Sequence, residues 1–155
     1  MAEFQEEKDT TYLTDKILAR ENGSFERDVQ KFLKENEAEL THPDAREFFK
    51  NIVKSKPKEL QKTMESCAIS LNMDRGNLSN GLAGKKPLTR EAVMALAVVA
   101  SFTVDEANRL LKYMGMQELY ARNKVDAIVM TALVYQKGLY EVHETMQRNG
   151  LGLLV

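Results

Sequence analysis

The amino-acid sequence predicts an all-α protein, built as a single helical bundle of about seven or eight helices. Apolar residues recur at helical spacing along almost all of the 155 residues, and no stretch shows the sustained alternation of a half-buried strand. The composition is that of a globular, helix-forming chain, with 43% hydrophobic and 29% charged residues and only three prolines.

The N-terminal part predicts an acidic helical leader over residues 1–43, followed by a domain over residues 44–155. Ser24 begins the leader's clearest run, in which one face carries Phe25, Val29, Phe32 and Leu33. After "THPD", apolar residues fall at i, i+3, i+4, i+7 and i+8 from position 45, which predicts an amphipathic helix. That helix should end near "KSKP", and Pro57 suits the first turn of the next one.

The next apolar stripe comprises Leu60, Met64, Cys67, Ala68 and Leu71. The single cysteine, Cys67, is predicted to be a small core residue rather than a reactive thiol, because no histidine or basic cluster accompanies it in the sequence. The cysteine count also requires no oxidising compartment.

Four helices are predicted in the C-terminal half. Thr89 caps a helix in which "AVMALAVVA" is apolar all round and therefore central to the fold. "TVDE" at 103–106 is a capping box that begins a helix ended by Gly115. "KVDAIVMTALVYQ" and "LYEVHETMQR" follow, separated by Gly138.

These four helices are predicted to form two copies of one hairpin. A shift of 35 residues superimposes Glu106 on Glu141, Leu111 on Met146, Gly115 on Gly150 and Leu119 on Leu154. Two copies are fewer than a stacked solenoid needs, so two hairpins packed in one globular bundle are expected.

Charge is distributed unevenly along the chain. Residues 49–90 hold nine basic and three acidic side chains, whereas residues 1–48 hold seven and 13. A positive middle segment indicates an anionic partner, although ordinary variation in solvated surface charge would give the same pattern.

The stretch "LNMDRGNLSNGLAGKKPLTREAV", from Leu71 to Val93, fits the second half of a helix, tight turn, helix arrangement. Ala68 suits a close helix crossing, Asn72 the left-handed turn, and Leu78 the apolar anchor of the second helix. Asp74 is the predicted N-cap of that helix. The spacing of these positions is that of a DNA-binding helix-turn-helix.

Over roughly residues 25–154, the sequence resembles Cro/cI-like (XRE-type) helix-turn-helix proteins, and more closely a bacterial group in which such a module follows an acidic helical leader. The resemblance lies in "KFLKENEAEL", "SLNMDRGNLSNGLAGKKPLTREAVMALAVV", "VDEANRLLKYMG", "LYARNKVDAI" and "EVHETMQRNGL". It implies the fold more firmly than the function. Gly81 and Leu82 depart from the family pattern, and Gly76 and Gly81 predict a weak second helix. Either packing holds this helix, or it ends early, near Asn80.

If the second helix lies in a major groove, its first turns face the base edges. The predicted base contacts are Arg75, Asn77, Ser79 and Asn80. Arginine suits guanine and asparagine suits adenine. The predicted phosphate contacts are Lys58, Lys62, Lys85, Lys86 and Arg90. The alternative is that the amides merely solvate a short exposed helix and that "GKKP" is a polar turn.

Other kinds of site are not predicted. His42 and His143 are far apart and lack ligand-spaced partners, so we expect neither a metal site nor catalytic residues, and no cofactor. Arg122 and Asp126, at i and i+4, are expected to form a surface ion pair or a helix start. No window approaches the roughly 18 apolar residues of a membrane span, and the acidic N-terminus is unlike a signal peptide. A cytoplasmic location with no membrane contact is therefore expected.

The sequence thus favours a bacterial or phage-type transcriptional regulator that binds double-stranded DNA as a homodimer, without catalysis. The C-terminal helices and the tail "LGLLV" are the expected dimer surface. The alternative is an adaptor that keeps the helix-turn-helix scaffold and binds a protein partner instead of DNA.

Overall fold

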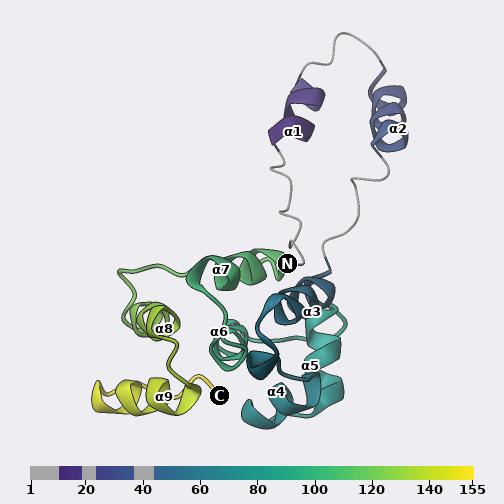
Figure 1. Cartoon of the computed structure of the whole chain (residues 1–155). Helices are drawn as coiled ribbons and strands as arrows, with labels where there is room; N and C mark the ends of the chain where they lie inside the picture. Colours follow the sequence, from purple (N-terminus) through teal and green to yellow (C-terminus); the bar gives the residue numbers. More distant parts are fainter. Residues whose placement is uncertain (1–10, 19–23, 37–43) are drawn as a thin grey trace. The chain divides into compact units, whose positions relative to one another are not determined.

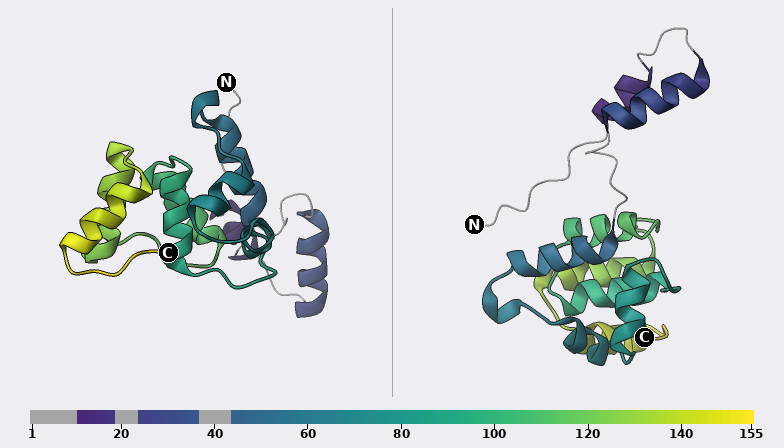
Figure 2. Two further views of the ribbon diagram at one scale, coloured as in Figure 1. Left: turned by 90° about the horizontal axis from the view of Figure 1, so that it is seen from below. Right: turned by 90° about the vertical axis from the view of Figure 1, so that its right-hand side faces the viewer.

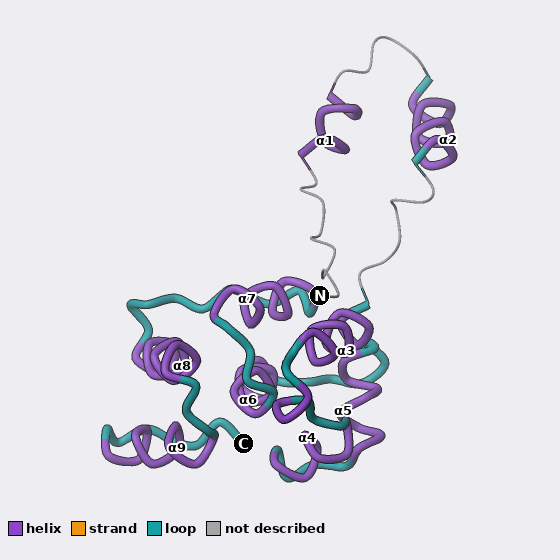
Figure 3. Tube along the Cα trace, viewed as in Figure 1, coloured by secondary structure: helices purple, strands orange, loops and turns teal. Residues whose placement is uncertain are grey.

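The predicted all-α fold class is confirmed. A computed structural model describes residues 11–18, 24–36 and 44–155. Over these ranges it contains nine α-helices, α1 to α9, and a short 3-10 helix, η2, with no strand (Figures 1 and 3). The described residues divide into two units, one containing α1 and α2 and the other Asp44–Val155.

The first unit contains α1 (Thr11–Leu18) and α2 (Phe25–Glu35). The Lys16 ammonium donates to Asn36 Oδ1 at 2.6 Å, and Asn36 Nδ2 donates to the Phe32 carbonyl at 2.8 Å. Ser24 is the N-cap of α2, as predicted. None of the α2 side chains is fully buried. On the predicted apolar face, Phe25 is 81% exposed, whereas Val29 and Phe32 are half-buried.

The second unit begins with α3 (Ala45–Ser55), which presents its predicted apolar face to the core. Phe49 lies against Phe102 with ring centroids 5.6 Å apart, and Phe48 stacks on Tyr113 at 4.5 Å. These aromatic contacts attach α3 to the C-terminal half of the chain.

The segment after α3 differs from the prediction. Pro57 precedes only the short η2 (Lys58–Leu60), and α4 (Met64–Ser70) begins later, where the Thr63 hydroxyl accepts from the Ser66 amide. The first amides of a helix have no partner within the helix, and the Thr63 hydroxyl provides one for Ser66. This cap accounts for a helix that begins at Met64 rather than at Pro57. Leu60 is consequently outside the buried stripe and 37% exposed.

Helix α5 (Arg75–Leu82) follows α4, and α6 (Arg90–Val99) then crosses the centre of the unit. As predicted, Thr89 caps α6, and α6 is buried from Ala92 to Val98. Figures 1 and 2 show α6 enclosed by its neighbours; it packs against α4, α7, α8 and α9. The core of the unit is therefore organised around one almost wholly apolar helix.

The predicted 35-residue repeat is present in the backbone. The first hairpin is α6 with α7 (Val104–Tyr113), and the second is α8 (Lys124–Tyr135) with α9 (Leu139–Arg148). Ser101 and Gln136 both adopt positive φ at the hairpin bends, and Gly115 and Gly150 do so after the second helices. The predicted capping box of Thr103 and Glu106 is also confirmed.

The repeat extends to a side chain that holds the segment after each hairpin. In the first copy Asn108 Oδ1 accepts from the Leu119 amide at 2.8 Å, and in the second His143 Nε2 accepts from the Leu154 amide at 3.2 Å. Leu119 and Leu154 are both buried. Leu154 thus packs within its own chain, so the tail offers less surface to a dimer than predicted.

The stability of this contact should depend on pH, because burial lowers the pKa of His143 below its ordinary value. A lowered pKa means that the unfolded chain binds the proton first as the pH falls. Neutral His143 therefore makes its full contribution to the free energy of unfolding above a pH of about 6.5. That contribution declines as the pH falls toward the pKa of His143 in the folded chain.

In the variant His143→Asn, the amide oxygen can still accept from the Leu154 amide, as Asn108 accepts from Leu119 in the first copy. The variant has no group at this position that titrates near neutral pH. We expect a smaller loss of stability for this variant than for the parent chain between about pH 7 and pH 5.5, measured by urea unfolding. Equal losses would show that His143 is not the group responsible.

None of the helices in the described ranges could cross a lipid bilayer. The longest, α8, has 12 residues and so measures about 18 Å, against the roughly 30 Å of a hydrocarbon core.

Candidate nucleic-acid interface

The turn between α4 and α5 has the geometry predicted for it. Asn72 adopts the left-handed conformation with φ of 58°, and the Met73 amide donates to the Ala68 carbonyl at 2.9 Å. Ala68 is buried in α4. An asparagine tolerates this conformation better than most residues, which accounts for a tight turn at this position.

Helix α5 is capped and anchored at the predicted positions. The Asp74 carboxylate accepts from the Asn77 amide at 3.2 Å, and Leu78 is fully buried. Of the two predictions for this weak helix, support by packing agrees with the structure and the early end near Asn80 does not, because α5 continues to Leu82. Gly81 is buried against Leu88, and a Cβ at this glycine would lie 3.2 Å from Leu88 Cβ. The missing side chain therefore permits close packing that holds the last turn of α5.

Only part of the predicted base-contacting set faces solvent. Arg75 and Asn77 are exposed, whereas Ser79 and Asn80 are half-buried. Arg46 Nη1, from α3, donates to Ser79 Oγ at 3.2 Å. The Ser79 hydroxyl is therefore engaged with α3, which leaves it less available to a base than Arg75 or Asn77. Asn77 Oδ1 accepts from the Lys86 ammonium at 2.9 Å.

Four of the five predicted phosphate contacts are exposed around α4 and α5. Lys58 lies in η2 and Lys62 lies just before α4, while Lys85 and Lys86 follow α5. Neither Lys58 nor Lys62 is part of α4, as the predicted earlier start of that helix would have required. In the sequence, these four lysines place positive charge before α4 and after α5.

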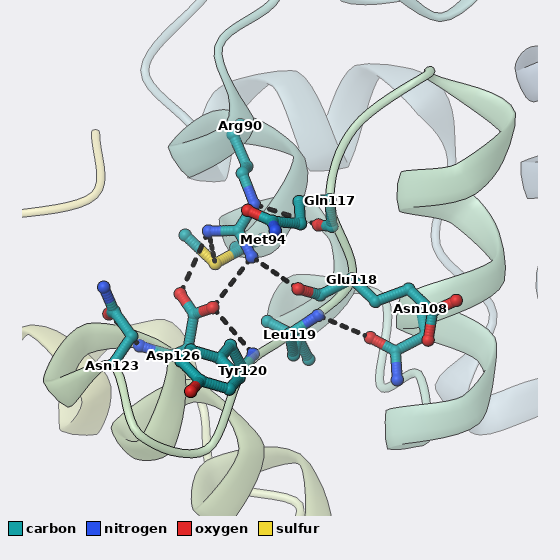
Figure 4. A network of polar contacts seen from close by, with 9 residues as sticks. All are labelled: Arg90, Met94, Asn108, Gln117, Glu118, Leu119, Tyr120, Asn123 and Asp126. Carbon is teal, nitrogen blue, oxygen red and sulfur yellow. Dashed lines mark hydrogen bonds and ion pairs between the residues drawn. The ribbon is translucent and has the colours of Figure 1, made fainter.

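Arg90 is the fifth predicted phosphate contact, and the structure contradicts that prediction. Its guanidinium binds Asp126 through two hydrogen bonds of 2.8 and 3.0 Å, and it also donates to the carbonyls of Gln117 and Glu118 (Figure 4). The fixed donors of an arginine are then occupied within the chain. Arg90 joins α6 to α8 and to the segment between α7 and α8.

Asp126 is the acceptor at the centre of this network, and its side chain is only 4% exposed. Burial alone would raise the pKa of Asp126, but hydrogen bonds from Arg90 and from the Tyr120 amide outweigh it and leave this pKa below its usual value. Of the two expectations for Arg122 and Asp126, the surface ion pair is wrong, since Asp126 is buried and Arg122 is exposed. The helix start is present, because α8 begins at Lys124. The sequence did contain a signal for the role of Asp126 as a buried acceptor, because this aspartate lies within an otherwise apolar helix.

The remaining candidate for chemistry is Cys67, which is fully buried. Burial raises the pKa of its thiol to about 11, so the thiolate is scarce at neutral pH. The predicted core role of Cys67 is confirmed. Within the described ranges, no three histidine, cysteine or carboxylate side chains lie together as a metal site would require. His42 lies outside the described residues.

The exposed face of α5 is thus the candidate interface, with Arg75 and Asn77 on the helix and lysines before α4 and after α5. Comparisons with protein-family models, with curated proteins and with solved structures found no match for this chain.

Proposed function

We propose that the chain is a cytoplasmic transcriptional regulator of bacterial or phage type, in which α4, the Asn72 turn and α5 form a Cro/cI-like helix-turn-helix that binds duplex DNA. The observation that carries the proposal is the orientation of α5. Leu78 anchors this helix in the core, while Arg75 and Asn77 lie exposed in its first turn. A short helix held in this way is suited to the major groove.

The chemistry of the two exposed side chains supports reading of base edges. Arg75 can donate two hydrogen bonds to guanine O6 and N7, and Asn77 can pair with adenine N6 and N7. Lys86 now donates to Asn77, and in the complex it would move to a phosphate and release the amide. Lys58, Lys62 and Lys85 would add phosphate contacts that position the helix without reading sequence.

The regulator would bind as a homodimer. Two copies of α5 would then contact successive turns of the major groove, about 34–36 Å apart, on a two-fold symmetric operator. Sedimentation of the full chain with and without DNA would establish this stoichiometry.

DNA binding is tested by selecting a preferred site from a randomised duplex pool and measuring affinity by fluorescence anisotropy. The variants Arg75→Ala and Asn77→Ala should each lose about 1–3 kcal/mol of binding free energy for the selected site and little for random duplex. Lys58→Ala should weaken binding to the selected site and to random duplex by the same factor. It should also reduce the number of ions released on binding, read from the salt dependence of the affinity, by about one. Arg122→Ala, an exposed arginine outside α4 and α5, is the matched control and should change neither affinity.

A second candidate function is that of an interaction module without DNA affinity. It is favoured by the engagement of Ser79 with Arg46 and of Arg90 with Asp126, which leaves fewer groups for DNA than the sequence predicts. Failure of the full chain to bind any duplex at low salt would reject the regulator and favour this module.

A further inference from the structure

A groove runs between α8 and α9, far along the chain from α5. Its volume is about 500 Å³, and most of its exposed lining is apolar. The residues that line it include Ile128, Thr131, Tyr135, Lys137, Glu141 and Thr145. An open apolar groove between two helices is the kind of surface that accepts a third helix.

The 35-residue repeat shows what covers the same surface in the first hairpin. Some repeat positions are buried in both copies, such as Val98 with Leu133 and Leu111 with Met146. Other positions are buried only in the first copy. Val93, Leu96 and Ala100 are buried there, whereas their equivalents Ile128, Thr131 and Tyr135 are half-buried or exposed.

In the first hairpin, α3 and α4 pack against the two helices of the hairpin. Helix α3 packs against α7 and α4 packs against α6. Phe49 of α3 contacts Phe102, and the Lys56 ammonium at the end of α3 pairs with Glu106. The repeat equivalent of Glu106 is Glu141, which is exposed and lines the groove.

We propose that the α8–α9 groove binds an amphipathic helix of a partner protein, in the way that the first hairpin binds α3. The partner helix has the α3 pattern, with large apolar residues at i, i+1, i+4 and i+5 and a lysine three residues further on. Its apolar side chains contact Ile128, Thr131 and Tyr135, and its lysine pairs with Glu141. This site is separate from α5 and does not depend on DNA binding.

The groove also differs from the first hairpin in a way that suits reversible binding. Lys137 stands where the first copy has Phe102, and Thr145 stands where it has Leu110. The groove is therefore less apolar than the surface under α3, so it can remain exposed to water until a partner binds.

The probe is a fluorescent peptide of residues 44–57, added to the full chain. Because a helix of this length is marginal in water, the peptide carries Lys54→Glu with a lactam bridge to Lys50, both on the face that is exposed in α3. We expect Thr131→Glu to weaken peptide binding at least about tenfold, because it places a charge under the apolar face. The matched control Gln147→Glu, on the opposite face of α9, should leave affinity unchanged.

A charge exchange identifies the pairing. Glu141→Lys should weaken binding of the peptide about threefold. A peptide with Lys56→Glu should restore the affinity for the Glu141→Lys variant, but it should not improve binding to the parent chain. The proposal is overturned if the peptide fails to bind at about 1 mM. It is also overturned if Thr131→Glu leaves binding intact, since the peptide would then occupy another surface such as that of α3. Conversion of a dimer to a monomer by Thr131→Glu would assign the groove to a second copy of the chain and equally overturn it.

Discussion

Replacing Arg90 with alanine is expected to lower the free energy of unfolding by about 3 kcal/mol. Asp126 would remain in the core with its side chain 4% exposed and without the two hydrogen bonds from the guanidinium. Loss of one partner of a buried ion pair is costly because the other charge keeps its burial and loses its compensation. The carbonyls of Gln117 and Glu118 would lose their donor as well.

Urea unfolding of the full chain measures this effect, and the chain provides a close control. Arg122→Ala removes an exposed arginine four residues before Asp126 in the sequence and should change stability by no more than about 0.5 kcal/mol. The double variant Arg90→Met with Asp126→Leu should recover part of the loss, because no charge is then left buried. A loss below about 1 kcal/mol in Arg90→Ala would show that water, rather than the protein, compensates Asp126.

The contrast between Arg90 and the helix caps shows which features could be predicted from the sequence. Thr89, Thr103 and Asp74 were found because a cap and its amide lie within three residues of each other. Arg90 and Asp126 are 36 residues apart, so their pairing depends on how α6 and α8 pack. No local pattern contains that information, and the nearer Arg122 at i−4 was the natural but incorrect partner.

The same argument applies to the exposed face of α5. The turn at Asn72 and the anchor Leu78 follow from spacing alone. Which of the polar residues faces solvent depends on α3, because Arg46 binds Ser79 across 33 positions of sequence. Gly81 was predicted to weaken the end of the helix on its intrinsic propensity, yet contact with Leu88 decides the outcome.

The repeat illustrates a related limit. A shift of 35 residues identifies equivalent positions, but it does not show that α3 and α4 cover only the first copy. Ile128 and Tyr135 resemble ordinary core residues in the sequence, and only the structure shows that they border an open groove.

Leu78→Ala tests whether packing, rather than helix propensity, holds α5 in place. Gly76 and Gly81 each cost about 0.5–1 kcal/mol in a helix relative to alanine, so α5 would be weak alone. Leu78 is fully buried, and its truncation removes apolar contact and leaves a cavity. We expect a loss of about 3–5 kcal/mol in the free energy of unfolding.

The control for Leu78 is Ile69→Ala in the neighbouring helix α4, because Ile69 is 73% exposed and its truncation should change stability by about 0.5 kcal/mol or less. Amide hydrogen exchange adds a local measurement: in Leu78→Ala the amides of α5 should lose more protection than those of α6. If α5 stays protected and stability falls by less than about 1 kcal/mol, Leu78 is not the anchor. The proposed DNA-binding face would then lack the rigid support that places Arg75 and Asn77, since a reading helix must be held by its scaffold before its side chains can discriminate between bases.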